Sequence, residues 1–224
     1  MSEIGLAFSG PFRDPDWSVK FIIGALVVLL CLTGLGIFVL AGYYIQLTQR
    51  VMRNEQFPLP SWSDLGVKFV VGVKYVVVLF LYALPIILLA LPLMILFAVA
   101  AVDQGSASMA VAASIYMFAF SLVAVPYGVF LSFLAPIIAY RFAAREKIAD
   151  ALNVGAVFKA FKTHWESTVI VALIILGIQS FSWIGLLGFV VGVLFTIFYV
   201  YLVSAYLHGL LYCEHVKKGG EVLV

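Results

Sequence analysis

The side chains that could do chemistry in this 224-residue chain are concentrated in two basic segments, 50–74 and 141–166. Four Lys or Arg residues fall in the first segment and five in the second. Cations beside apolar sequence are typical of surfaces that bind anionic lipid headgroups or protein partners. The candidate contact residues in these segments are Arg50, Arg53, Trp62, Asp64, Lys159 and Lys162.

Three further polar residues, His164, His208 and Tyr212, could also take part in chemistry. His208 and Tyr212 stand one helical turn apart near the end of the last apolar run, where they are candidates for a contact between helices or for lining a polar cavity. Asp64 and His164 could serve a lipid-modifying enzyme, but neither has a second catalytic partner at a sensible spacing. We therefore predict that the protein is not an enzyme and carries no cofactor.

Composition excludes several classes of protein. Hydrophobic residues make up 65% of the chain and charged residues 11%, whereas soluble domains are about 45–50% apolar and 25% charged. The apolar runs hold no Asp, Glu, Lys or Arg, which argues against a proton relay or an ion pump. A dispersed net charge of +2 argues against nucleic acid, and Cys31 and Cys213 have no metal-binding spacing.

Long apolar runs predict the elements that position these residues. A bilayer core takes about 20 helical residues, and the runs lack the alternation of membrane strands. We predict an all-α bundle in one membrane domain, 1–224, with interfacial segments at 48–68 and 142–164. The five expected spans are 19–47, 70–101, 110–140, 166–181 and 186–212.

Two of these spans raise further questions of packing. The first run is either one tilted span or, broken between Thr33 and Gly36, two half-length helices that return to the side they left. The broken form would give six membrane segments. Gly188 and Gly192 form a GxxxG pattern in the last span, which fits packing within the chain or a homo-oligomer.

The distribution of Lys and Arg predicts the orientation. Both basic segments and the C-terminal tail carry them, while the turns near 103 and 183 carry none. The positive-inside rule then places the basic segments and the C-terminus in the cytoplasm. The N-terminus lies outside with five spans and inside with a returning first run.

The second basic segment contains an amphipathic pattern. Val154, Phe158, Phe161 and Trp165 recur at spacings of four, three and four, while Lys159 and Lys162 fall between them. This pattern predicts a helix that lies in the membrane interface instead of crossing the bilayer.

The chain resembles a prokaryotic membrane family, the domain of unknown function number 4013. The resemblance rests on GYYIQLTQRV, FPLPSWSDLGVKFVVGVK and YLHGLLY, above all on Leu59, Pro60, Trp62 and Asp64 and on His208 and Tyr212. The first run lacks the proline expected near its middle. This resemblance implies an integral membrane protein of bacteria or archaea and supplies no reaction.

These observations favour a non-enzymatic multi-pass protein of the cell membrane. We expect it to act as a scaffold, accessory or regulatory subunit through contacts with a protein partner or with anionic headgroups of the lipid bilayer. The alternative is a small transporter or channel for a neutral or apolar solute, which proline bends in the middle spans and tyrosines in the last span would suit.

Overall fold

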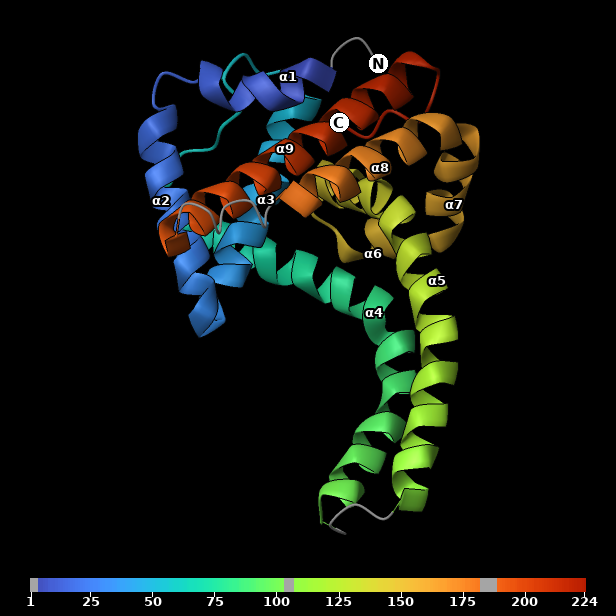
Figure 1. Ribbon diagram of the computed structural model, residues 1–224. Coiled ribbons are helices and arrows are strands. Elements are labelled where there is room, and N and C mark those ends of the chain that lie inside the picture. The colour runs from blue at the N-terminus through green and yellow to red at the C-terminus, as the bar shows by residue number, and fades with distance from the viewer. Residues whose placement is uncertain (1–3, 103–106, 182–188) are drawn as a thin grey trace. The chain divides into compact units, whose positions relative to one another are not determined.

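A computed structural model describes residues 4–102, 107–181 and 189–224, and all its regular elements are helical (Figure 1). Part of the expected outer turn near 103 and most of the expected turn near 183, with Gly188, lie outside these ranges. The elements are α1 (Ile4–Ser9), η1 (Gly10–Arg13), α2 (Trp17–Leu30), η2 (Cys31–Thr33), α3 (Leu35–Met52), α4 (Leu65–Val102), α5 (Ala107–Arg145), α6 (Ile148–Leu152), α7 (Val154–Thr163), α8 (Trp165–Phe181) and α9 (Phe189–Lys217).

Several helices are long and apolar enough to cross a membrane. Among the described residues, Leu65–Val99, Ser108–Arg145 and Gly192–Lys217 qualify as single helices. Two bent pairs, Ile4–Arg13 with Trp17–Thr33 and Val154–Thr163 with Trp165–Ser180, raise the number of candidate spans to five. The prediction of an all-α bundle is confirmed, and the described residues provide three to five candidate spans.

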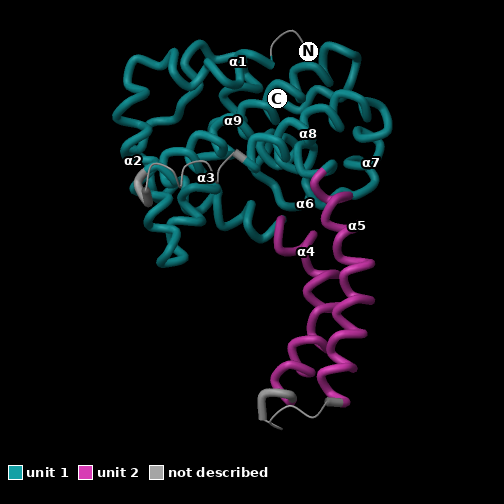
Figure 2. Tube along the Cα trace, viewed as in Figure 1, with its two compact units in different colours: residues 1–78, 133–224 teal, residues 79–132 magenta. Residues whose placement is uncertain are grey.

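The chain divides into two compact units (Figure 2). One contains residues 1–78 and 133–224, and the other contains residues 79–132 from the adjoining parts of α4 and α5. The smaller unit has large apolar side chains on its surface, among them Phe80, Met94, Ile115 and Phe118. Such a surface is stable in hydrocarbon, as expected of membrane helices.

Helix α9 forms the centre of the larger unit, where it packs against α3, α2, α8 and α1 (Figure 1). Its residues Phe198, Leu202 and Leu207 are fully buried, as are Ile45 and Leu47 of α3. A helix that is apolar all round must be covered by other helices or by lipid. The larger unit therefore has a conventional packed core.

The first apolar run is divided into α2 and α3, as in the broken arrangement. Helix α2 ends at Leu30, and α3 begins at Leu35 after the short η2. Gly34 between them has φ 81°, a left-handed conformation that glycine adopts without steric cost. Because α2 and α3 pack against each other, the run forms a helical hairpin.

Two glycines bring the backbones of α3 and α4 together. A Cβ atom on Gly42 would collide with the Lys68 carbonyl, and one on Gly72 would collide with the Phe38 carbonyl. Small residues allow such close approach between membrane helices. This contact joins the start of α4 to the hairpin within the larger unit.

Candidate interfacial helix and anion-binding pocket

Helix α7 has defined ends that set its direction. Asn153 begins it, with its side-chain oxygen accepting a hydrogen bond from the Ala156 N–H at 3.0 Å. At His164 the chain bends by 98° before α8 begins. If α8 runs along the membrane normal, α7 therefore lies nearly parallel to the membrane surface.

One face of α7 is apolar and exposed. Val154 is 59% exposed, Phe158 39%, and Phe161 is partly exposed. The Lys162 ammonium lies 5.5 Å from the centre of the Phe158 ring, a cation–π contact. Trp165, expected on the same stripe, begins α8 and is 55% exposed. The sequence-predicted amphipathic helix is thus present, with its cation beside its apolar stripe.

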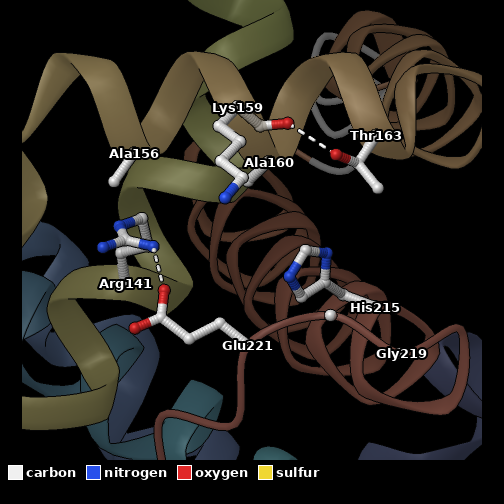
Figure 3. A pocket seen from close by; sticks show the side chains of 9 residues that line it. Arg141, Ala156, Lys159, Ala160, Thr163, His215, Gly219 and Glu221 are labelled. Atoms are coloured by element: carbon white, nitrogen blue, oxygen red, sulfur yellow. Dashed lines mark hydrogen bonds and ion pairs between the residues drawn. The ribbon is translucent and has the colours of Figure 1, made fainter.

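The opposite face of α7 lines a pocket of about 290 Å³. At 100° per residue, Ala156, Lys159, Ala160 and Thr163 lie roughly half a turn away from Val154, Phe158 and Phe161. Arg141 of α5, His215 of α9 and the tail residues Gly219, Gly220 and Glu221 complete the lining. Figure 3 shows Arg141, Lys159 and His215 around the pocket. They belong to α5, α7 and α9, respectively.

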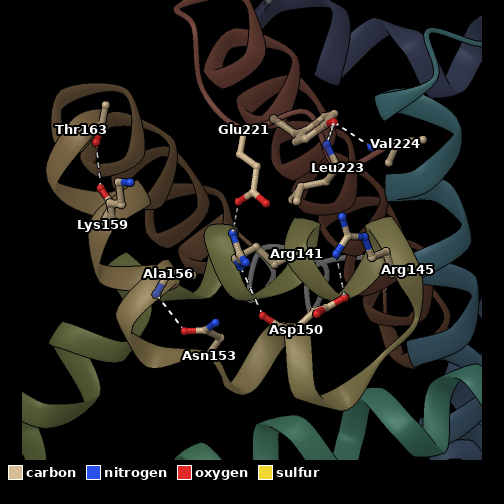
Figure 4. Close-up of polar contacts among 11 residues, drawn as sticks. Arg141, Arg145, Asp150, Asn153, Ala156, Lys159, Thr163, Glu221, Leu223 and Val224 are labelled. Carbon is tan, nitrogen blue, oxygen red and sulfur yellow. Dashed lines mark hydrogen bonds and ion pairs between the residues drawn. The ribbon is translucent and has the colours of Figure 1, made fainter.

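Arg141 is the buried charge of this pocket. The residue is only 8% exposed, and its Nε donates to the Asp150 carbonyl at 3.2 Å. Its Nη1 lies 3.4 Å from the Glu221 carboxylate. Beside it, Arg145 pairs with the Asp150 carboxylate at 3.7 Å (Figure 4). A buried guanidinium requires an anion or several acceptors, and here an exposed glutamate supplies the anion.

The C-terminal tail lies against the end of α9. Gly219 has φ 83°, and a Cβ atom on Gly220 would collide with the His215 ring, so both positions suit glycine. Further along, the Tyr212 hydroxyl accepts hydrogen bonds from the backbone N–H groups of Leu223 and Val224 at 2.8 and 3.0 Å. These contacts hold Glu221 against Arg141.

Two histidines meet at the pocket, whose lining includes His215. The rings of His164 and His215 are 4.5 Å apart between centroids and nearly perpendicular. Burial lowers the pKa of His164, the Lys218 charge lowers it further, and the Glu214 carboxylate opposes this shift. Glu214 also accepts hydrogen bonds from Lys218 at 2.7 Å and from Ser167 at 2.8 Å, which joins α9 to α8.

The first basic segment is largely occupied with internal contacts. The Leu59 carbonyl accepts hydrogen bonds from Lys20 Nζ at 3.1 Å and from Arg50 Nη1 at 3.3 Å. The Trp62 indole N–H donates to the Lys20 carbonyl at 3.0 Å. Its ring stacks on Tyr43 at 4.2 Å between centroids. Arg50 and Trp62 therefore hold the loop between α3 and α4 in place.

The remaining predicted residues are dispersed. Arg53 and Asp64 are exposed at the two ends of that loop. His208 is buried in α9, with Nδ1 at 2.6 Å from the Tyr44 hydroxyl, so it forms a contact between helices. Gly192 belongs to α9, where its carbonyl accepts a hydrogen bond from Thr196.

Lys159 is the predicted residue that lines the pocket, and Tyr212 holds the tail that closes it. Arg141, His215 and Glu221 are not among the residues predicted from the sequence. Arg141 and Glu221 are 80 positions apart, and no spacing pattern joins them. Within the described residues, no group of three His, Cys, Asp or Glu residues could hold a metal ion. The pocket lining contains two cations, Arg141 and Lys159, and one carboxylate, Glu221.

The long apolar helices are typical of a polytopic membrane protein. The chain belongs to the protein family of unknown function DUF4013, whose family model matches residues 25–203. This range includes the loop with Leu59 and Trp62, and it ends before His208 and Tyr212. Comparisons with curated proteins and with solved structures give no match.

Proposed function

We propose that this protein is a non-enzymatic scaffold or accessory subunit of a prokaryotic cytoplasmic membrane, and that α7 is its contact surface for anionic lipid headgroups. The observation that carries the proposal is the exposed apolar stripe of α7 with Lys162 against Phe158, on a helix turned 98° from α8. Apolar side chains enter the acyl boundary while neighbouring cations meet the headgroups.

The proposal includes the orientation that the positive-inside rule predicts. Lys159, Lys162, the exposed Arg53 and the C-terminal tail then lie on the cytoplasmic side. Substituted cysteines at Arg53 and Lys162, labelled in intact cells with an impermeant maleimide, test this orientation in a Cys31→Ala/Cys213→Ala background. Protection of both sites until the cells are opened supports the proposal, and labelling of one of them in intact cells contradicts it.

Lipid contact is tested by the double variant Phe158→Ala/Lys162→Gln, which changes the exposed face and leaves the pocket lining intact. Each lysine near an anionic surface contributes about 1 kcal/mol, so the anionic lipid that co-purifies should fall about fivefold relative to zwitterionic lipid. Mass spectrometry of the purified protein measures this ratio.

The matched control is Lys147→Gln, which removes one exposed cation between α5 and α6. It should leave the lipid ratio unchanged if α7 is the contact surface. An equal loss in both variants would indicate a general effect of net charge. An unchanged ratio in the α7 variant, shown to be folded, would remove the basis of the proposal.

A further inference from the structure

We propose that the pocket formed by Arg141, Lys159 and His215 binds a phosphate-type anion, and that Glu221 of the tail occupies this site as an internal competitor. The inference goes beyond the membrane contact of α7, because the pocket lies on the opposite face of that helix. The ligand class is phosphate or a phosphate monoester.

The lining has the chemistry of a phosphate site. A guanidinium offers a planar set of donors that matches phosphate oxygens, and an ammonium adds a compact positive charge. The Arg141 side chain uses two of its five N–H donors in the contacts described, with Asp150 and Glu221. The cavity of about 290 Å³ is at the small end of ligand pockets, which fits a phosphate with a short substituent.

The Glu221 carboxylate occupies the position beside Arg141 where an external anion would bind. Its carboxylate is 3.4 Å from Arg141, yet 59% of its side chain is exposed, so water screens the ion pair and breaking it costs little free energy. The lining carries two permanent cations against this one carboxylate. A phosphate dianion would compete for the same guanidinium with greater charge, and the glycine-containing tail would release.

The position of the pocket favours a ligand from water. Because Val154, Phe158 and Phe161 face away from it, a helix inserted by that stripe turns Lys159 toward the aqueous side. A free phosphate monoester therefore reaches the pocket more easily than a headgroup does. A lipid phosphate remains the second source of the same chemistry, and the experiment separates the two.

The test uses the full chain purified in a neutral detergent and titrated with inorganic phosphate and with glycerol 3-phosphate by calorimetry. Glu221→Gln removes the competing charge and should tighten binding about three- to tenfold. Arg141→Gln should weaken binding at least about tenfold. Lys147→Gln, outside the pocket lining, should leave the affinity unchanged.

Nanodiscs of phosphatidylcholine with and without phosphatidic acid separate the two sources. Binding of glycerol 3-phosphate that phosphatidic acid does not displace supports a soluble ligand. Phosphatidic acid retained by the wild type and lost in Arg141→Gln, without binding of the soluble probes, supports a lipid phosphate.

Binding of none of these probes by the wild type or by Glu221→Gln would overturn the inference. So would an affinity unchanged in both Glu221→Gln and a folded Arg141→Gln. If Arg141→Gln does not fold, Lys159→Gln replaces it, since Lys159 is exposed. The lipid ratio of the Phe158→Ala/Lys162→Gln variant is a separate measurement, so the two proposals can fail independently.

Discussion

The hydroxyl of Tyr127 in α5 donates a hydrogen bond of 2.7 Å to the carbonyl of Tyr82 in α4, three residues before Pro85. Tyr116 makes the same bond to Leu89, three residues before Pro92. A proline inside a helix removes a backbone donor and disturbs the hydrogen bonds of the preceding turn. Each tyrosine thus donates to the carbonyl three residues before a proline of α4, within the turn that the proline disturbs.

We predict that Tyr127→Phe lowers the free energy of unfolding by about 0.5–1.5 kcal/mol, the range for a typical intramolecular hydrogen bond. The effect should be smaller in a Pro85→Ala background, because without the proline ring the Ile86 N–H can approach the Tyr82 carbonyl in regular helical geometry. A double-mutant cycle from unfolding in detergent measures this coupling. Strict additivity of the two changes would contradict the link between the tyrosine and the proline.

The contact between α3 and α4 gives a second prediction. Gly72→Ala places a methyl group against the Phe38 carbonyl, so the helices must separate, and we expect a loss of about 1–3 kcal/mol. Thermal unfolding in detergent measures it.

Gly66 provides the matched control for Gly72, because it lies in the same helix with nothing near its Cβ position. Gly66→Ala should be neutral or stabilising by up to about 1 kcal/mol, since alanine favours helix. Equal effects of the two substitutions would mean that the close approach does not limit stability.

Hydropathy predicts much of this fold, because a long uncharged run can be stable in lipid only as a helix or a closed barrel. Helices α4, α5 and α9 could therefore be expected from composition alone. The turn at Gly34 could be named only as one of two arrangements, since its apolar neighbours suit either a span or a hairpin. Packing of α2 on α3, which no local pattern encodes, corresponds to the second arrangement.

The pocket was harder to predict than the helices. Periodicity indicates the amphipathic α7, but it does not show that Lys159 faces Arg141 and a tail far along the chain.

For Trp62, the local sequence indicates one environment and the structure shows another contact. Tryptophan beside a basic segment is typical of a membrane interface, and here its ring stacks on Tyr43 within the protein. The transporter alternative stays a hypothesis that flux into proteoliposomes tests.

The lowered pKa of His164 predicts that the stability of the fold depends on pH. His164 has a folded-state pKa below the ordinary value of 6.5, through burial and Lys218, with Glu214 opposing. As the pH falls, the unfolded chain therefore takes up the proton first, and the folded state loses stability. This contribution is complete above about pH 7 and declines as the pH falls below 6.5.

Thermal unfolding between pH 7.5 and pH 5 should show this decline, and His164→Gln should reduce its slope. The His215 ring contacts His164, and the charges of Lys218 and Glu214 also act on it. Because these groups are still present in the variant, part of the slope should remain. A slope as steep in the variant as in the wild type would assign the dependence to other groups.

The loop between α3 and α4 gives the last prediction. Trp62→Ala removes the stack on Tyr43 and the hydrogen bond to the Lys20 carbonyl, and we expect a loss of about 3–5 kcal/mol. Trp62→Phe keeps an aromatic ring and should lose about 1 kcal/mol, the contribution of one hydrogen bond. Cleavage by trypsin after the exposed Arg53 should accelerate in the order wild type, Phe, Ala.

Trp165→Ala is the control for this loop, because Trp165 is 55% exposed and begins a different helix. It removes an indole of the same size, yet it should leave both unfolding in detergent and cleavage after Arg53 unchanged. If Trp62 fixes the loop, the two substitutions must differ in unfolding in detergent and in cleavage after Arg53. If Trp62→Ala resembled Trp165→Ala, the paired contacts of Lys20 and Arg50 with the Leu59 carbonyl would be sufficient to hold the loop.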